Sequence, residues 1–395
     1  MIDTKYMKQN KWTQEFAVLA SESYEKKSTP TLTIIENGTI LPTQSAEGFS
    51  WGKGGVLDSN GKFVQASSVG TGGHAFGGKY QFNENKVEIV NETIVFIGIV
   101  PKHWGHFLID TVSRFWIFLS EEYKRYKVAF CGWGWSDTKI DGNFLQTFEL
   151  MGINKRNLMF IDHPIKASKI IIPEATMEFG ATWNKAYRDT INHIAIGALN
   201  NEICSKLKAY DRIYFTRTQF LKSKLNEIGE KEIESLFKTA GFLVLVPEKL
   251  SIVEQIFYIR NCKIMASMSG TIPHNSVFAK DGMKLIILNR TPIINPPQLR
   301  INQLSNTNWV YVDVYTKRME KNPADYGEGP IQIEITNQLI RYLEDNKFKI
   351  DSNVISKIKC IKIKNNIVFY FLLIFKKIKK LKMYSQLKKI YNKYK

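Results

Sequence analysis

The feature that most constrains the fold is a regular alternation of strand and helix patterns in residues 212–288. Short runs of β-branched and aromatic residues are separated by helical patterns, one of which opens with a capping box from Ser251 to Glu254. An alternation of this kind predicts a doubly wound unit with a parallel sheet. The predicted strands are 212–217, 242–246, 263–266 and 284–288, and the predicted helices are 226–240 with Asn226 as its cap, 251–260, and a short one after Thr271.

The carboxyl ends of these strands carry residues that suit an anionic ligand, which in such sheets binds at that edge. Arg217 supplies a permanent positive charge, and the backbone N–H and hydroxyl groups of Ser269-Gly270-Thr271 can bind a phosphate. Small residues are also common at such turns for structural reasons alone. Glu254 could reach a ribose hydroxyl, although its place in the capping box is the simpler role. His274, followed by Asn275, could donate to an anion or cap its own short helix.

The first half of the chain is also predicted to be α/β. A strand is expected at 31–35, a hairpin over 55–65 around Ser59-Asn60-Gly61, and a strand buried on both faces at 93–100. Strand and helix patterns then alternate from 126 to 172. Such an alternation is typical of α/β proteins.

A single helix is predicted over residues 102–120, with a polar stripe at three- and four-residue spacing. His106 and Asp110 lie one turn apart on that stripe, so the carboxylate can orient the imidazole and raise its basicity, as a general base requires. The alternative is a histidine that is bonded within its own domain for structural reasons. The stripe consists of His103, His106, Asp110 and Arg114.

The C-terminal tail holds most of the charge. Thirteen lysines and no acidic residue follow Ser356, so the tail carries +13 of the formal net charge of +18. Within it, residues 367–375 form an apolar run of nine, too short for a spanning helix, which needs about 20 apolar residues. Apolar residues between lysines suit the interface of an anionic membrane. The alternative is a terminal helix that packs its aromatic side on the body and leaves the lysines in solvent.

Other classes of protein are disfavoured by what the sequence lacks. The four cysteines are far apart, so neither a disulfide framework nor a cysteine zinc site is indicated, and a cytosolic body is expected. A G-x-G-x-x-G fingerprint is absent, which argues against a dinucleotide oxidoreductase. An Asp-x-Asp pair is absent too, and His103 and His106 lack the spacing of a helical zinc pair, so a metal is not expected. Nucleic acid is disfavoured because the excess of positive charge is concentrated in the tail, without interleaved aromatic residues on a sheet or a helix-turn-helix.

Several short motifs occur in order along the chain. They are Gly105-His106-Phe107-Leu108-Ile109-Asp110, Tyr214-Phe215-Thr216-Arg217, Gly241-Phe242, Pro247-Glu248, Leu250-Ser251 with Glu254-Gln255, Ser269-Gly270 with His274-Asn275 and Phe278, and Gly282 with the strand to Leu288. In order and spacing, over about residues 90–290, these motifs resemble those of glycosyltransferase family 61. At Met268-Ser269-Gly270-Thr271 many members of that family, especially eukaryotic ones, carry Pro-His-Gly-Ala, whereas this chain follows the Ser-Gly…His-Asn form of bacterial relatives.

The resemblance implies an α/β, GT-B-like fold of two Rossmann-like domains and inverting transfer without an essential metal or cofactor. It also implies a nucleotide-sugar donor, usually a UDP-sugar, and a glycan or lipid-linked glycan acceptor in bacterial surface polysaccharide synthesis. Such a transfer needs a base for the acceptor hydroxyl and positive groups for the departing diphosphate. The expected base is Asp110, or His106 paired with it. The expected donor site is Arg217, Ser269, Gly270 and Thr271 for the diphosphate, Glu254 for the ribose, and His274 and Asn275 nearby.

The predicted organisation is a β-rich N-terminal region (1–92), a Rossmann-like acceptor domain (93–205), a Rossmann-like nucleotide-sugar domain (206–350) and a basic amphipathic tail (351–395). We expect a cytoplasmic protein held peripherally at the inner face of the cell membrane through Lys357–Lys395. Three alternatives stay open: a non-catalytic nucleotide-sugar or polysaccharide-binding component of an assembly complex, a sugar epimerase of similar fold, and a membrane-surface scaffold.

Overall fold

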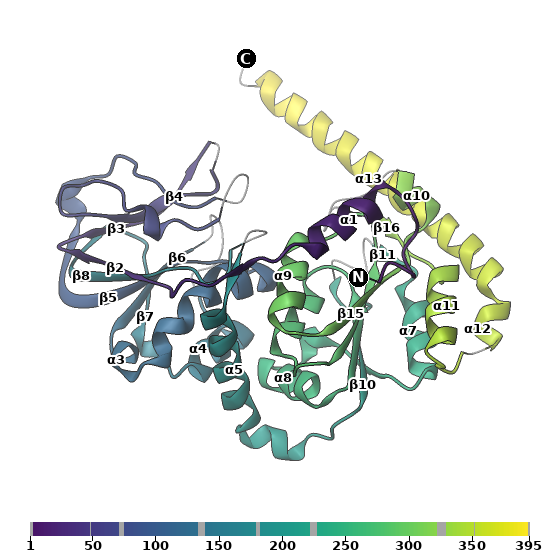
Figure 1. The fold of residues 1–395 in the computed structure, drawn as a ribbon. Helices are drawn as coiled ribbons and strands as arrows, with labels where there is room; N and C mark the ends of the chain where they lie inside the picture. Colours follow the sequence, from purple (N-terminus) through teal and green to yellow (C-terminus); the bar gives the residue numbers. More distant parts are fainter. Residues whose placement is uncertain are drawn as a thin grey trace.

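Figure 1 shows a computed structural model of the chain, a mixed α/β structure with several sheets. It describes residues 3–47, 49–70, 75–132, 139–178, 182–221, 227–321, 329–350 and 352–393. Within these ranges the side chains of residues 49, 50 and 379–393 are not described.

The C-terminal half is built on a five-stranded parallel sheet of order β12-β10-β13-β14-β15. Counted within this half, the order is 2-1-3-4-5, a doubly wound arrangement whose switch point lies between β10 and β13. The four strands predicted from the alternation are therefore confirmed, and β15 is a fifth strand that the sequence analysis did not predict. The bounds are Arg212–Phe215 (β10), Leu243–Leu245 (β12), Ile264–Met268 (β13), Lys284–Asn289 (β14) and Asn308–Asp313 (β15).

Side chains of this sheet alternate between two apolar cores, one on each face. Along β14, Leu285 and Ile287 belong to one core, whereas Ile286 and Leu288 belong to the other. A strand buried on both faces must be apolar at every position, which explains the continuous hydrophobic run in the sequence. The helical elements of this half are Glu230–Thr239 (α7), Ile252–Asn261 (α8), the 3-10 helix Ile272–Phe278 (η9), Pro296–Leu304 (α9), Lys317–Lys321 (α10) and Asn337–Asp345 (α11).

Two helix starts in this half test the capping predictions. The Ser251–Glu254 capping box is confirmed, because each side chain bonds the backbone N–H of the other residue. The helix predicted to begin at Asn226 begins instead at Glu230, with Gly229 in a left-handed conformation as its N-cap. Asn226 itself lies outside the described residues. Glu227–Ile228 forms a short strand, β11, which pairs with Ile331–Gln332 (β16), and this pairing delays the start of the helix.

The N-terminal half contains a seven-stranded mixed sheet of order β4-β3-β8-β5-β6-β7, with β2 also paired to β8. Strands β5, β6, β7 and β8 are parallel, whereas β2, β3 and β4 are joined by antiparallel pairing. The bounds are Leu32–Glu36 (β2), Thr39–Ala46 (β3), Phe49–Leu57 (β4), Glu88–Val100 (β5), Lys127–Gly132 (β6), Leu158–Phe160 (β7) and Ile165–Pro173 (β8), with helices Glu121–Lys124 (α3), Gly142–Leu150 (α4) and Lys185–Leu199 (α5).

The hairpin predicted over 55–65 forms as a tight turn after β4. Leu57 and Phe63 make an antiparallel bridge, the Asp58 N–H donates to the Lys62 carbonyl at 2.9 Å, and the Val64 N–H donates to the Val56 carbonyl at 2.8 Å. β4 also pairs with β3.

One expectation for this half differs from the structure. The predicted boundary between residues 92 and 93 falls inside β5, so the β-rich strands and the parallel strands share one sheet. Pairing of strands far apart in sequence produces this result.

The predicted helix over 102–120 is helical but not a single α-helix, which corrects the expectation. It begins as Trp104–His106 (α2), widens to a π-helical turn at Phe107–Thr111 and continues as the 3-10 helix Val112–Leu119 (η5). Turns of π-helix occur mostly at functional sites.

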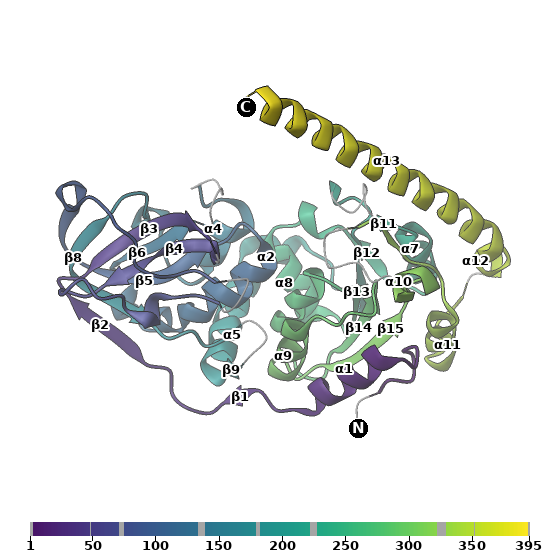
Figure 2. The same cartoon turned by 90° about the horizontal axis from the view of Figure 1, so that it is seen from above.

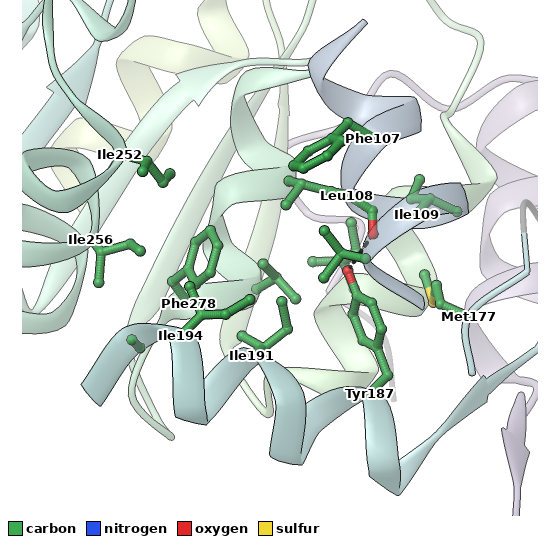
Figure 3. Packing of buried hydrophobic residues seen from close by; sticks show 14 of the residues in the cluster. Phe107, Leu108, Ile109, Met177, Tyr187, Ile191, Ile194, Ile252, Ile256 and Phe278 are labelled. Atoms are coloured by element: carbon green, nitrogen blue, oxygen red, sulfur yellow. Dashed lines mark hydrogen bonds between the residues drawn. The ribbon is translucent and has the colours of Figure 1, made fainter. Parts of the chain in front are cut away.

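One apolar core joins the two halves, as Figure 3 shows. Ile191 and Ile194 of α5 lie between Leu108 of the first half and Ile256 and Phe278 of the second. The N-terminal segment adds a further link: Lys11–Ser21 (α1) packs Phe16 on Trp309 and Tyr311, and Glu25–Lys26 (β1) then pairs with Trp183–Asn184 (β9) (Figure 2).

The tail forms Ser352–Ser356 (α12) and the long helix Ile358–Lys393 (α13), which runs along the C-terminal half and extends beyond it (Figures 1 and 2). Phe369 is 2% exposed and belongs to the core under α7 and α11. The packing alternative for the tail is thus correct for one side of the helix. None of the described helices is long and apolar enough to cross a membrane.

Candidate active site

Asp110 and His106 are brought together as the sequence predicted. The His106 Nδ1 atom lies 3.0 Å from Asp110 Oδ2, and Asp110 is only 4% exposed. The rings of Trp51 and His103 lie against His106, with centroids 4.8 and 5.0 Å from its own. The imidazole is therefore held in place by a buried carboxylate and two rings, as a group that accepts a proton at a fixed point must be.

The π-helical turn that carries Asp110 is fixed by side chains around it. The Tyr187 hydroxyl donates to the Leu108 carbonyl at 2.8 Å (Figure 3), and Thr111 Oγ1 donates to the Ile99 carbonyl at 2.9 Å. Ser113 Oγ donates to the Asp110 carbonyl at 3.1 Å. Two of these bonds satisfy carbonyls of the irregular helix and the third ties it to β5, so the turn has a defined shape.

Arg114, the last member of the predicted stripe, faces a different set of partners. It is 3% exposed, and its guanidinium donates to the Pro173 carbonyl and, at 2.8 Å, to the Ser68 carbonyl. Burial lowers the pKa of Arg114 to about 10, while the negative charge of Asp110 acts to raise it. Arg114 stays protonated at neutral pH and stabilises the charged form of Asp110 in return.

A cavity of about 450 Å³ opens beside Asp110. Its wall combines polar and apolar side chains and carries charges of both signs, and polar groups in such a pocket fix the orientation of a bound ligand. Among its lining residues are Thr31, Gln65, Asp110, Arg114, Glu174 and Glu178.

The start of α2 packs against the turn after β13. This contact joins the predicted base, on the helical segment that begins with α2, to the predicted donor site. Trp104 Nε1 donates to Asn275 Oδ1 at 2.6 Å. A Cβ at Gly105 would lie 3.2 Å from His274 Cδ2 and 3.3 Å from Thr271 Cγ2, so a glycine permits this close approach. Residues from the first half and from the Ser-Gly-Thr turn thus meet at one place.

Two arginines converge on Gly270 at the switch point of the C-terminal sheet. A Cβ at Gly270, whose φ is +132°, would lie 2.7 Å from Arg290 Nη2 and 3.5 Å from Arg217 Nη1. Glu227 Oε1 lies 2.9 Å from Arg217 Nη2 and 2.5 Å from Arg290 Nη1, so one carboxylate holds both guanidinium groups. Arg290 Nε also donates to the Ser269 carbonyl at 2.6 Å.

Glu230 fixes the backbone beneath this pair. Its Oε1 atom accepts from the Arg217 N–H at 2.8 Å and from the Tyr214 hydroxyl at 3.2 Å. Burial raises the pKa of Glu230 to about 7. Much of its negative charge is therefore absent at neutral pH, which leaves the positive charge of the two arginines less compensated.

The remaining predicted donor residues have partners within the protein. Glu254 accepts from both the backbone N–H and the hydroxyl of Ser251 at 2.8 Å, the capping role. His274 Nδ1 lies 2.6 Å from Gln298 Oε1, and burial lowers the pKa of His274 to about 4, so the imidazole is neutral at physiological pH and adds no positive charge. Asn275 Nδ2 donates to Gln255 Oε1 of α8 at 2.8 Å. The Asn275 amide therefore links the segment after β13 both to α8 and, through its oxygen, to Trp104.

Arg290 and Glu227 are the residues that sequence reasoning missed. Arg290 follows β14 directly, so the strand-end argument that selected Arg217 applies to it equally. Glu227 does not follow a predicted strand, so the strand-end argument could not select it. The pairing of β11 with β16 brings it to the two arginines. Across the described part of the chain, no three His, Cys, Asp or Glu side chains are grouped so as to hold a metal ion.

The fold and this site define an α/β protein with a buried acid–histidine pair in its first half and two arginines at a sheet switch point in its second half. The family model described as Glycosyltransferase 61 matches residues 104–286, a segment that contains every predicted site residue. The chain therefore carries a glycosyltransferase family 61 domain and is a glycosyltransferase, whose substrates are in general a sugar donor and a glycan acceptor. A search of curated proteins found no match.

Proposed function

We propose that this glycosyltransferase is a GT-B-like, inverting, metal-independent enzyme that transfers a sugar from a nucleotide-sugar, in the first instance a UDP-sugar. The observation that carries the proposal is the convergence of Arg217 and Arg290 on Gly270, near the point where α2 meets Thr271 and His274. Two guanidinium groups supply the positive charge that a departing diphosphate needs. The 2-1-3-4-5 sheet order supports a nucleotide at this switch point.

The transfer step follows from the two groups of residues. The acceptor hydroxyl loses its proton to Asp110, or to His106 held by it, and its oxygen attacks the anomeric carbon from the side opposite the diphosphate. The bond from the anomeric carbon to the diphosphate oxygen breaks, and the electron pair leaves with that oxygen. Arg217, Arg290 and the N–H groups of Gly270 and Thr271 stabilise the resulting charge. The Ser269 N–H donates to the Leu288 carbonyl at 2.8 Å and holds the turn in place.

We assign the 450 Å³ cavity beside Asp110 to the acceptor, because the proposed base forms part of its wall. Glu254 remains our assignment for the nucleoside ribose. His274 and Asn275 are placed as positioning residues of the donor site, since their side chains bond Gln298, Gln255 and Trp104.

The acceptor that fits the rest of the chain is a glycan or lipid-linked glycan of bacterial surface polysaccharide synthesis. A lipid-linked acceptor lies at the inner face of the cell membrane, and the thirteen lysines after Ser356 favour an anionic surface of that kind. We therefore propose a cytoplasmic enzyme that associates peripherally with the membrane.

The decisive experiment measures thermal stabilisation of the purified chain by UDP, GDP, CMP and TDP, with and without EDTA. A ligand that binds only the native state raises the melting temperature. The proposal expects a shift that is specific to one nucleotide and insensitive to EDTA. It is rejected if no nucleotide stabilises the protein, and metal independence is rejected if EDTA removes the shift. The anomeric configuration of the transferred sugar, read by NMR, then tests inversion.

A further inference from the structure

Helix α13 has two apolar faces, only one of which is covered. The covered face is fixed to the body by Phe369, with Leu372 and Leu373 partly buried beside it. Polar contacts hold the same side: Gln332 Nε2 donates to Asn366 Oδ1 at 2.8 Å, and Arg318 Nη2 donates to the Tyr370 hydroxyl at 2.8 Å.

The opposite face of α13 carries an exposed apolar stripe. Its two phenylalanines are the most exposed members, with Phe371 at 65% and Phe375 at 72%. At 1.5 Å per residue the stripe is about 22 Å long. Its positions recur at three- and four-residue spacing, about half a turn away from Phe369, so the stripe cannot reach the body while Phe369 stays buried. The exposed stripe consists of Ile363, Ile367, Phe371, Ile374, Phe375 and Ile378.

Positive charge accompanies this stripe. Lys359, Lys364 and Lys377 are exposed on the same helix, and the sequence from Ser356 onward contains no carboxylate side chain. Apolar side chains between cationic ones match the boundary between acyl chains and anionic headgroups. One acidic contact of the helix, Glu334, lies on the body, where it pairs with Lys362 at 3.3 Å.

We propose that the outer stripe of α13 is the membrane-binding surface of the enzyme and inserts between the headgroups of an anionic bilayer. Because the inner face of the helix is fixed to the C-terminal half, binding sets the orientation of that half at the membrane. The role of this surface, to bring the enzyme to a lipid-linked acceptor, rests on the proposed function. The position of the surface follows from α13 alone. A docked protein or a second copy of the chain is the competing occupant.

Vesicle sedimentation of the full chain tests this surface. The wild type should bind vesicles that contain phosphatidylglycerol, should release them at high salt, and should bind phosphatidylcholine vesicles much less. A variant with Phe371→Ser, Ile374→Ser and Phe375→Ser should bind on the order of 100-fold more weakly. A control variant with Val18→Ser, Ile89→Ser and Ile196→Ser changes three exposed apolar residues outside the tail and should bind like the wild type.

The outcomes separate this inference from the proposed function. Equal vesicle binding by the wild type and the α13 variant overturns the inference, as does a wild type that binds no vesicles. A wild-type dimer that the α13 variant converts to a monomer, without vesicle binding, assigns the stripe to a second copy instead. Nucleotide stabilisation is measured on the same samples, and its absence in the wild type refutes the donor site while vesicle binding still decides the role of α13.

Discussion

Replacing Arg217 by alanine tests the diphosphate site most directly. Arg217 Nη2 bonds Glu227 at 2.9 Å and its side chain is 12% exposed, so its loss removes one of the two guanidinium groups at Gly270. A hydrogen bond to a charged group contributes about 1.5–3 kcal/mol, so the Kd for UDP should rise by about 10- to 150-fold. In this variant Glu227 keeps its contact with Arg290, so the free energy of unfolding should fall by only about 1–2 kcal/mol. The loss would be larger if the substitution left the buried carboxylate of Glu227 without any positive partner.

The assay is isothermal titration of UDP into wild type, Arg217→Ala, Arg217→Lys and Arg212→Ala. Lysine keeps the charge but loses the planar fork, so Arg217→Lys should bind with an intermediate affinity. Arg212 lies at the amino end of the same strand, where its Nη1 donates to the Ala240 carbonyl at 3.0 Å, and its replacement should leave UDP affinity unchanged. A Kd for Arg217→Ala within twofold of the wild-type value would refute the assignment of this residue to the diphosphate.

Three further predictions concern the same region. Asp110→Asn should lower kcat by about 10²- to 10⁴-fold in a transfer assay while UDP still binds, and unchanged turnover would exclude Asp110 as the base or its partner. Gly270→Ala should abolish stabilisation by UDP, because its Cβ would lie 2.7 Å from Arg290 Nη2 at a φ of +132°; a normal thermal shift would contradict the site geometry. Burial raises the pKa of Glu230 from 4.5 to about 7, so its protonated form stabilises the fold below pH 4.5 and this contribution is lost as pH rises through 7. In the wild type, the unfolding free energy measured by urea denaturation should therefore decline by about 3 kcal/mol between pH 4.5 and pH 8 because of this group. Glu230→Gln should lack that decline. A pH dependence equal to that of the wild type would show that Glu230 is not the group responsible.

Local sequence patterns predicted four of the five strands of the C-terminal sheet, and β15 was not among them. The predicted strands are visible as short, mostly apolar runs because they are largely buried, and the crossover between parallel strands is usually a helix. The capping box at Ser251 and the contact between His106 and Asp110 were also predictable, because both join residues three or four positions apart.

Predictions failed where a long-range contact overrides a local preference. Asn226 is a favourable helix cap, but pairing of β11 with β16 delays the helix to Glu230. The boundary predicted between residues 92 and 93 falls inside β5, because pairing with the distant strand β8 continues across it. The helical period around Asp110 did not predict a π-helical turn, because that turn depends on bonds from the distant side chain of Tyr187.

The sequence by itself determined the doubly wound C-terminal sheet, the acid–histidine pair and the basic tail, since each is encoded by residues close together in the chain. Only the tertiary structure decided that Glu227 links Arg217 with Arg290, that Gly105 packs against Thr271, and that α13 buries one apolar face and exposes the other. The physical reason is common to all three: each contact depends on the burial and pairing of segments tens to hundreds of residues apart, whose relative position no local pattern specifies.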